Sequence, residues 1–251
     1  MNPIGRAPPG GYGDPMELSD TELPLVGRGR AADVFDAGGG RVLRRYRSAR
    51  ADSVGREALA MRHLREHGAP VPEVFSAEGT DMVMQRLDGS TMLEVLKTKP
   101  WKARAIGRQL RGLHTLFHAV PAGDIALPRF SDGDAILHLD LHPDNVMLTT
   151  AGPMIIDWSN VAVGDPLADV MNTWMIMVTS SPDDVPVFLR PLVRRIRRSL
   201  ADGFIDGTPI DDAARGWIAR VCEQRLRDPN ARDHEKARVR AFAAEHGVSL
   251  A

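Results

Sequence analysis

Short stretches of apolar residues, bounded by Gly, Pro and other turn residues, recur between residues 23 and 84, and this pattern is typical of β-strands. Three consecutive glycines at residues 38–40 predict a tight turn between two of these stretches. Alternation puts Val42 and Arg44 on one face of the strand after that turn. The predicted strands cover residues 25–26, 33–35, 41–46, 74–75 and 82–84.

One helix is predicted among these strands. Asp52 and Ser53 are suited to its N-cap, because their side chains can accept hydrogen bonds from the free N–H groups of a first turn. Gly68 is suited to the position just after its end. Between them, apolar residues recur at helical spacing, which predicts one buried face formed by Val54, Ala58, Met61 and Leu64.

Helical spacing dominates the rest of the chain, after a linker that opens at Gly89. Two apolar stretches, 146–148 and 154–156, flank a turn sequence and predict a β-hairpin. Residues 101–117 predict an amphipathic helix with an apolar face of Ile106, Leu110, Leu113 and Leu116. A loop is predicted at 121–134, and further helices at 167–179, 185–204, 210–227 and 230–246.

This order of elements predicts an α+β fold with two lobes, the first small and rich in strands, the second larger and helical. The predicted divisions are a flexible N-terminus at residues 1–18, a first lobe at 19–86 and a second lobe at 87–251, with a hinge near 85–90. The first 15 residues are rich in Gly and Pro and lack the apolar core of a signal peptide, so we expect no fixed structure there. A length of 251 residues with 43% hydrophobic content agrees with an ordinary globular protein.

Charge and cysteine content argue against several classes of function. A net charge of −1 gives no electrostatic reason to expect nucleic-acid or membrane binding. The longest apolar run, 171–178, is too short to span a bilayer. The single cysteine, Cys222, excludes an internal disulfide and a cysteine-based metal cluster, and it fits a cytoplasmic location.

The densest chemical signal is the segment HLDLHPDN, residues 138–145. It has the spacing of the kinase catalytic loop, in which the Asp accepts a proton from the substrate hydroxyl and the Asn holds a magnesium ion. These residues are Asp140 and Asn145, and the predicted hairpin would bring Asp157 beside Asn145 as a second oxygen ligand. The three side chains indicate phosphoryl transfer from ATP, with Asp140 as catalytic base and Asn145 and Asp157 as metal ligands. The alternative is that the aspartates of this segment only form the turn around Pro143.

Two glycines lie in the connection between the first two predicted strands. Gly27 and Gly29, followed by Ala32, have the spacing of a phosphate-binding loop, in which a missing Cβ lets backbone N–H groups approach phosphate oxygens. The segment joins two strands, so it is not a dinucleotide-binding fingerprint, and no Lys-Ser/Thr follows as a Walker loop requires. An ordinary β-turn containing two glycines is the alternative.

Arg44 lies where kinases carry their phosphate-binding lysine. An arginine can serve there because its guanidinium is always charged. Glu57, on the first predicted helix, is the natural ion-pair partner that would orient Arg44. The alternatives are a solvated arginine on an edge strand and a surface glutamate.

Histidines allow a different interpretation. His138 and His142 flank Asp140, and imidazoles on one face of an extended strand could bind zinc together with Asp157. No third histidine follows at a ligand-like spacing, and the pair four residues apart on the earlier helix, His114 and His118, fits a helix surface equally well. A zinc-dependent hydrolase is therefore the less favoured function.

Together these motifs resemble the aminoglycoside phosphotransferase and choline kinase-like enzymes, which are relatives of protein kinases. The resemblance extends over about residues 25–175, roughly three-fifths of the chain. After the catalytic loop, its most specific segments are 156–158 (IDW) and 164–169 (GDPLAD). Leu139 and Ala32 depart from the family pattern, which has a small residue and a glycine there. The other matching segments are 27–29, 42–44, 56–58, 70–72, 83–89 and 113–114.

This resemblance implies a bilobal protein-kinase-like fold that uses ATP and Mg²⁺. The adenine would lie against the hinge, the phosphates under the glycine loop, and catalysis would consist of positioning and charge neutralisation. In the segment 164–169, Asp165 and Pro166 fit a helix start. Asp169 would then lie in the first turn, where the helix dipole stabilises a negative charge. The implied nucleotide-binding residues are Gly27, Gly29, Ala32, Arg44, Glu57, Met84, Gln85 and Leu87.

The expected acceptor is a hydroxyl group of a small molecule whose identity the motifs leave open. Residues 185–251 hold 13 Lys and Arg against 9 Asp and Glu, a difference of +4, which disfavours a polycationic antibiotic and allows a neutral or anionic compound. The basic cluster within them (Arg190, Arg194, Arg195, Arg197 and Arg198) also fits a solvated helix face. No Ala-Pro-Glu motif follows, which disfavours a protein kinase, and a nucleotide-binding pseudokinase is the remaining alternative. The oligomeric state is left open.

Overall fold

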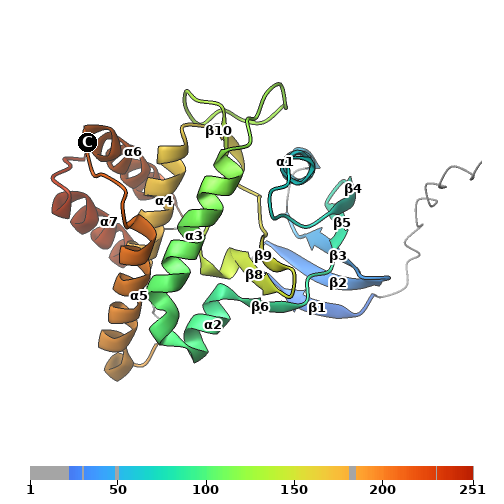
Figure 1. Ribbon diagram of the computed structural model, residues 1–251, viewed down its shortest axis with the longest axis horizontal. Helices are drawn as coiled ribbons and strands as arrows, with labels where there is room; N and C mark the ends of the chain where they lie inside the picture. Colours follow the sequence, from blue (N-terminus) through green and yellow to red (C-terminus); the bar gives the residue numbers. More distant parts are fainter. Residues whose placement is uncertain (1–22, 30, 49–50, 181–184, 230, 251) are drawn as a thin grey trace, which may run out of the picture.

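The computed structural model describes residues 23–29, 31–48, 51–180, 185–229 and 231–250. It has an α+β fold in which an N-terminal β-sheet lies beside a helical C-terminal part, as the pattern predicts (Figure 1). The predicted flexible segment 1–18 lies outside the described residues. Within the described ranges, no helix is long and apolar enough to cross a membrane.

The N-terminal sheet has five strands, and all neighbouring pairs are antiparallel. The turn between its second and third strands consists of Gly38, Gly39 and Gly40, whose φ angles of 72°, 57° and 72° are easily adopted only by glycine. In spatial order the strands are β1 (Leu25–Arg28), β2 (Ala32–Gly38), β3 (Arg41–Tyr46), β5 (Asp81–Gln85) and β4 (Val74–Glu78).

Helix α1 (Ala51–Glu66) packs on the β4 side of this sheet. The four apolar residues predicted for its inner face are all buried, which confirms the helical period. Its start differs from the prediction: the helix already includes Ala51, so Asp52 and Ser53 lie in the first turn and are not N-caps.

The predicted linker after Gly89 is wrong, because this segment forms strand β6 (Gly89–Thr91) and helix α2 (Met92–Thr98). Thr91 and Glu94 form a capping box at the start of α2, a signal that was present in the sequence. A Cβ on Gly89 would lie 2.1 Å from the carbonyl oxygen of Leu148, so only glycine allows β6 to approach its partner strand this closely.

The predicted hairpin is confirmed as β8 (Val146–Thr149) and β9 (Gly152–Ile155), and β6 pairs with β8 to form a three-stranded sheet. This small sheet lies between the N-terminal sheet and the C-terminal helices (Figure 1). A further strand pair, β7 (Ala135–Leu137) with β10 (Ala162–Gly164), was not predicted. The 3₁₀ turn Pro143–Asn145 precedes β8.

The C-terminal part consists of helices with buried inner faces, and α3 begins at Ala103 after a 3₁₀ turn, two residues later than predicted. Leu116 was assigned to its apolar face but is 58% exposed. Arg197 belongs to the predicted basic cluster and donates to the carbonyl oxygen of Met177 in the last turn of α4. The helix dipole stabilises a positive charge at this end of a helix. The helices are α3 (Ala103–His118), α4 (Pro166–Thr179), α5 (Arg190–Ile205), α6 (Asp212–Arg227) and α7 (Asp233–Glu245), with a 3₁₀ turn at Val187–Leu189.

Helices α3 and α5 approach so closely that their contact depends on glycine. A Cβ on Gly107 would lie 2.1 Å from the carbonyl oxygen of Leu200, and one on Gly203 would lie 2.2 Å from that of Arg104. Because backbone atoms occupy both positions, neither neighbour can move aside without shifting a helix.

The exchange Gly107→Ala is expected to lower the free energy of unfolding by about 1–3 kcal/mol, the usual cost of overpacking a core. Gly112→Ala is the matched control in the same helix, since no atom lies within 4 Å of its Cβ position. There the better helix propensity of alanine should raise stability by about 0.5–1 kcal/mol. Urea unfolding of both variants tests this pair, and equal midpoints would contradict the close contact.

Candidate active site

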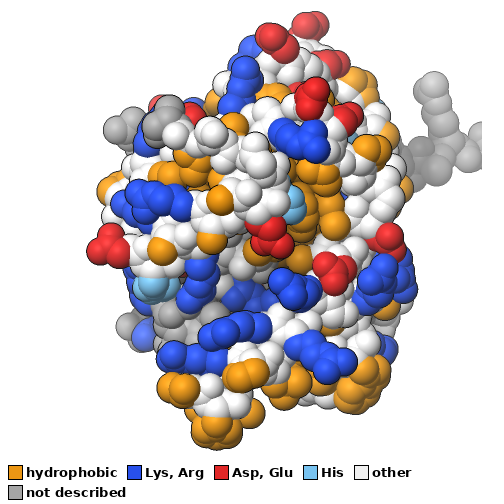
Figure 2. Space-filling view, turned by 90° about the vertical axis from the view of Figure 1, so that its left-hand side faces the viewer, with side chains coloured by type: hydrophobic (Ala, Val, Ile, Leu, Met, Phe, Trp, Pro, Cys, Tyr) orange, Lys and Arg blue, Asp and Glu red, His pale blue; other side chains and the backbone are white. Residues whose placement is uncertain are grey.

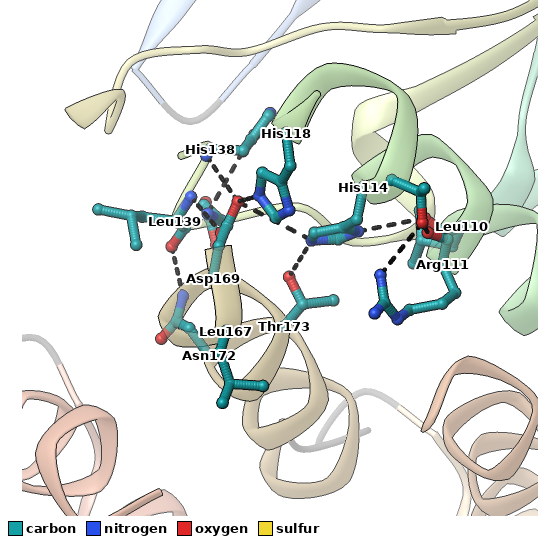
Figure 3. Close-up of polar contacts among 12 residues, drawn as sticks. Leu110, Arg111, His114, His118, His138, Leu139, Leu167, Asp169, Asn172 and Thr173 are labelled. Atoms are coloured by element: carbon teal, nitrogen blue, oxygen red, sulfur yellow. Dashed lines mark hydrogen bonds and ion pairs between the residues drawn. The ribbon is translucent and has the colours of Figure 1, made fainter. Parts of the chain in front are cut away.

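The segment 138–145 starts directly after strand β7 and is held from below by helix α4 (Figure 3). The backbone N–H groups of His138 and Leu139 each donate to a different carboxylate oxygen of Asp169, both at 2.8 Å. Asn172, one turn further along α4, donates its side-chain N–H to the carbonyl oxygen of Leu139 at 2.6 Å. These three bonds hold Leu139 at φ 61°, a left-handed conformation that is costly for a bulky residue.

The sequence predicted only a helix-dipole interaction for Asp169, but in the structure Asp169 also holds the backbone of His138 and Leu139. Its carboxylate is completely buried and also accepts a hydrogen bond from Nε2 of His118 at 3.0 Å. Burial works against its charged form, but the bond from His118 and the neighbouring histidines hold the pKa of Asp169 well below its usual value. Sequence reasoning missed Asp169 and Asn172 as supports of the loop, because their partners lie about 30 residues earlier.

His114 lies next to this carboxylate but carries no charge at neutral pH. Burial lowers its pKa to about 3, although its Nε2 lies 3.9 Å from Asp169. Its two ring nitrogens contact the carbonyl oxygen of Leu110 and the hydroxyl of Thr173. The short separation from Asp169 is thus a contact of a neutral ring and not an ion pair, since full burial outweighs one charged neighbour.

Because the buried His114 is neutral, we expect the protein to lose stability in mild acid. The unfolded His114 takes up a proton near pH 6.5, whereas the folded one does so only near pH 3. The unfolded state binds more protons between these values, so the free energy of unfolding falls as the pH falls, by up to about 1.4 kcal/mol for each unit.

Urea unfolding between pH 7.5 and 4.5 should show a shallower pH dependence for His114→Gln than for the wild type. Buried His138, whose pKa burial also lowers, keeps part of the slope. Gln109→Asn, at an exposed position that does not titrate in the same helix, serves as the control and should retain the wild-type slope. Identical slopes for His114→Gln and the wild type would contradict the assignment.

The hairpin places Asn145 and Asp157 at neighbouring positions. Ile156 donates its backbone N–H to the carbonyl oxygen of Asn145 at 3.0 Å, and Asp157 is the next residue along the chain. The side-chain amide nitrogen of Asn145 donates to the carbonyl oxygen of Asp140 at 2.9 Å, which leaves the amide oxygen for a ligand. The chain from the end of β7 to the residues just after β9 thereby brings together Asp140, Asn145 and Asp157.

Asp157 has a strained backbone and one buried carboxylate oxygen without an aligned hydrogen-bond donor. Its φ is 64°, and its Oδ1 lies 2.8 Å from Nη2 of Arg44 without a well-aligned hydrogen bond. Burial works against its ionised form, yet the charge of Arg44 holds the pKa of Asp157 below its usual value. A carboxylate that stays ionised and has a buried oxygen without an aligned donor is suited to bind a cation.

Asp140 has the opposite electrostatic character. Burial raises its pKa above the usual value, while His142 and His138 oppose the rise. A carboxylate with a raised pKa accepts a proton more readily than an exposed one, which is the property that a general base needs.

Arg44 connects the helix α1 to the hairpin. Its Nη1 lies 2.8 Å from Oε1 of Glu57, and its Nη2 contacts Asp157. Burial disfavours its charge, but Glu57 and Asp157 raise the pKa of Arg44 above its usual value. The predicted pair of Arg44 and Glu57 is thus present in the structure and extends to a third residue.

Glu57 is buried to 1% exposure and is satisfied by three donors. Besides Arg44, these are the hydroxyl of Tyr46 and the backbone N–H of Trp158 at 3.0 Å. Burial raises the pKa of Glu57, and Arg44 opposes that rise. Sequence reasoning missed Tyr46, although its position two residues after Arg44 on the same strand places both side chains on one face.

The predicted glycine loop does lie between two strands. Gly27 is the third residue of β1, Ala32 is the first residue of β2, and Gly29 donates its N–H to the carbonyl oxygen of Ala32 at 2.8 Å. Arg47, the residue after β3, donates to the carbonyl oxygen of Gly29 at 2.6 Å and pairs with Asp33, so it holds Gly29 beside β2. Residue 30 lies outside the described residues.

The predicted hinge residues differ in their surroundings. Met84 is 7% exposed and belongs to the hydrophobic core, whereas Gln85 ends β5 and Leu87 is half-buried. Gln85 accepts a bond at its side-chain oxygen from the backbone N–H of Glu73, and Arg86 donates its N–H to the carbonyl oxygen of Gly40. The side chain of Met84 is therefore packed inside the protein, and its backbone pairs with Val42 of β3 and Val74 of β4.

The geometry gives no support to a zinc site. Both ring nitrogens of His138 bond to the backbone, at Asp140 N and Ile156 O, and His142 accepts from the N–H of Asp144. Within the described ranges, no group of three or more His, Cys, Asp and Glu side chains is placed to hold a metal ion. A magnesium site differs in this respect, because Mg²⁺ needs only one or two protein ligands besides substrate phosphates.

The structure is similar to those of several small-molecule phosphotransferases. Aminoglycoside phosphotransferase APH(4)-Ia superposes with a TM-score of 0.62 at 18% identity, covering 91% of this chain and 95% of that one. APH(2'')-Ib in its ADP-bound form gives 0.59 at 14% identity, covering 92% and 96%. A choline/ethanolamine kinase family protein from Mesorhizobium loti gives 0.56 at 17% identity, covering 92% of each chain. At these identities the likeness establishes the fold.

A comparison with curated protein sequences finds no match to this chain. The sequence model of the phosphotransferase enzyme family, APH, matches residues 22–135 and 124–202, which together exceed half of the chain. The family resemblance of the motifs is thereby confirmed. The chain belongs to the phosphotransferase enzyme family.

Proposed function

We propose that the protein is an ATP-dependent kinase that transfers the γ-phosphate to a hydroxyl group of a small molecule. The observation that carries this proposal is the continuous set of contacts from Glu57 through Arg44 to Asp157, beside Asn145 and Asp140. A phosphate-binding cation, two oxygen ligands and a base are the parts that phosphoryl transfer requires.

In this function each part has one task. Asp140 accepts the proton of the acceptor hydroxyl, and the amide oxygen of Asn145 and the carboxylate of Asp157 hold Mg²⁺ together with the phosphates. Bound magnesium supplies charge neutralisation at the phosphates. Arg44, oriented by Glu57, binds the same phosphates. The backbone of Gly27, Gly29 and Ala32 also contacts the phosphates, and that of residues 84–87 contacts the adenine. The lobes are then residues 19–86 and 87–251, with the nucleotide between them.

Nucleotide complexes of related proteins support the nucleotide. One APH(4)-Ia variant is a ternary complex with AMP-PNP and hygromycin B, and APH(2'')-Ib is bound to ADP. This chain shares the fold and the family, so a nucleoside triphosphate is the proposed donor. A cytoplasmic location stays a prediction.

Magnesium-dependent nucleotide binding tests the proposal directly. We expect Mg²⁺ to strengthen AMP-PNP binding to the wild type, and Asp157→Asn to remove most of that gain, because an amide is a weaker ligand for a hard cation. Asp144→Asn is the matched control in the same loop, where the carboxylate accepts a bond from the hydroxyl of Thr91 at 3.0 Å. Isothermal titration with and without Mg²⁺ gives the comparison.

Equal magnesium dependence in the wild type and Asp157→Asn would remove the metal role of Asp157. A screen of hydroxyl compounds for ADP release separates the kinase from a pseudokinase. Nucleotide binding without turnover over the whole screen would support the pseudokinase instead.

A further inference from the structure

The cation proposed to bind the phosphates is an arginine, Arg44, where kinases carry a lysine. Many Lys and Arg side chains at the helical end of the molecule lie on the surface, with Asp and Glu among them (Figure 2). The side chain of Arg44 is instead only 13% exposed, so its neighbours determine where its charge points. The groups that enclose Arg44 therefore decide which cation fits this position.

Two carboxylates contact different nitrogens of the Arg44 guanidinium. Nη1 donates to Oε1 of Glu57 at 2.8 Å, and Nη2 lies 2.8 Å from Oδ1 of Asp157. A guanidinium is planar and presents its N–H groups in fixed directions, so it reaches both carboxylates and keeps further N–H groups for a phosphate. The ammonium of a lysine is a point charge on a flexible stem and lacks this fixed fork.

The ring of Tyr46 lies against the same guanidinium. Tyr46 follows Arg44 by two positions on β3, so both side chains extend from one face of the strand. The guanidinium carbon lies 4.7 Å from the centroid of the Tyr46 ring, within the range of a cation–π contact. A flat ring favours a flat guanidinium, which can stack on it, over the ammonium of a lysine.

The hydroxyl of Tyr46 holds the partner of Arg44. It donates to Oε2 of Glu57, while Oε1 accepts from Arg44 and from the backbone N–H of Trp158 at 3.0 Å. Burial and the negative charge of Glu57 raise the pKa of Tyr46, so the hydroxyl keeps its proton and remains a donor. Tyr46 thus acts on Arg44 twice, directly through its ring and indirectly through Glu57.

These residues differ in whether a ligand can reach them. The side chain of Glu57 is 1% exposed and Tyr46 is 5% exposed, whereas the side chain of Asp157 is 37% exposed. A nucleotide bound at this site can therefore contact Asp157 and the exposed part of Arg44, but Tyr46 is enclosed. Any influence of Tyr46 on the nucleotide has to pass through the residues that it contacts.

We propose, on the basis of the kinase function above, that Tyr46 is a positioning residue of the phosphate site. It fixes the guanidinium of Arg44 in one orientation, through its ring and through Glu57, and keeps the remaining N–H groups of Arg44 ready for the nucleotide phosphates. The site is thereby fitted to an arginine, so the exchange Arg44→Lys keeps the charge but not the phosphate affinity.

Isothermal titration with two ligands tests this role in Tyr46→Phe, which keeps the ring and removes the hydroxyl. Binding of AMP-PNP with Mg²⁺ should weaken by about three- to tenfold, because Glu57 loses a donor and holds Arg44 less firmly. Binding of adenosine, which has no phosphates, should be unchanged. A merely structural role of Tyr46 would weaken both ligands alike.

A double-mutant cycle with Arg44→Lys shows whether Tyr46 acts through Arg44. Arg44→Lys alone should weaken AMP-PNP binding by about tenfold or more, since the ammonium lacks the fork and the stacking. In the Arg44→Lys protein, the further exchange Tyr46→Phe should weaken AMP-PNP binding much less than in the wild type. The oriented guanidinium that the hydroxyl supports is already absent there.

Two control variants separate positioning from stability. Arg45→Lys makes the same exchange at the next residue of β3, whose side chain pairs with Asp81 at 2.7 Å on the other face, and it should leave the binding of both ligands unchanged. Leu64→Ala removes a buried apolar side chain further along α1 than Glu57. It should lower the midpoint of urea unfolding but leave both affinities of the folded protein unchanged.

The inference fails if Tyr46→Phe leaves AMP-PNP binding unchanged, if it weakens adenosine binding equally, or if its effect is the same in the Arg44→Lys protein. Wild-type AMP-PNP affinity in Arg44→Lys alone would also overturn it. Magnesium-dependent binding of AMP-PNP to the wild type is measured first. Its absence would overturn the kinase function and this inference with it, whereas its presence with an unchanged Tyr46→Phe protein would overturn only the role of Tyr46.

Discussion

Replacing Asp140 with asparagine is expected to lower kcat by about 10²–10⁴-fold, the usual contribution of a positioned general base. The amide keeps the shape of the side chain but cannot take the proton of an acceptor hydroxyl. Nucleotide affinity should stay unchanged, because Asp140 is not among the proposed phosphate or metal contacts. Steady-state ADP release, with AMP-PNP titration beside it, measures both quantities.

Asp144→Asn again supplies the control, since it makes the same exchange in the same segment at an exposed carboxylate bonded to Thr91. It should keep kcat within about twofold of the wild type, as expected of a surface substitution. A kcat for Asp140→Asn that matches this control would exclude Asp140 as the base. Circular dichroism spectra of all three proteins exclude misfolding as the cause of a loss.

Asp169→Asn is expected to cost about 3–5 kcal/mol of folding free energy, the range seen when one partner of a buried charged group is removed. The carboxylate accepts the backbone N–H groups of His138 and Leu139 and the ring N–H of His118. An amide can accept at one oxygen only, and its NH₂ group would face a donor. Leu139 would then lose support for its left-handed backbone, and the bond from Asn172 would remain.

Two measurements separate the stability effect from the effect on the site. Urea unfolding gives the free energy, and kcat of the fully folded fraction at low temperature reports the position of residues 138–140. We expect both to fall for Asp169→Asn, whereas Asp202→Asn, at an exposed position of α5, should change stability by less than about 0.5 kcal/mol. A folded Asp169→Asn protein with wild-type kcat would show that the loop does not depend on this carboxylate.

The sequence predicted those helices and strands whose hydrophobic period and turn residues lie within the element itself. The hairpin β8–β9 and the inner face of α1 follow from period and turn residues, and both are confirmed. The short strands β6, β7 and β10 were missed, because three residues are too few to show a period. Their pairing depends on partners far along the chain, such as Thr149 for Gly89.

In the candidate site, too, the sequence predicted residues within one segment and missed their contacts with distant parts of the chain. Asp140, Asn145 and Asp157 were found from spacing within one segment, and their roles stay predictions. The residues that support them were missed: Tyr46 and Trp158 on Glu57, and Asn172 on Leu139. Each of these bonds joins two separate parts of the chain, so the spacing of residues within one segment cannot predict it. The sequence predicted only that Asp169 interacts with the dipole of its own helix. A dipole argument considers that helix alone, so it could not predict the bonds from His138 and Leu139 to this carboxylate.

The bond from the N–H of Trp158 to Glu57 has a consequence for how the chain folds during synthesis. It joins residues 101 positions apart, and Ile155 likewise donates to Pro70 across 85 positions. The carboxylate of Glu57, on helix α1, lacks one of its donors until the ribosome has added Trp158, just after the hairpin. The N-terminal sheet should therefore stay loosely assembled on the ribosome and become rigid late, in one step with the segment that carries Asp140.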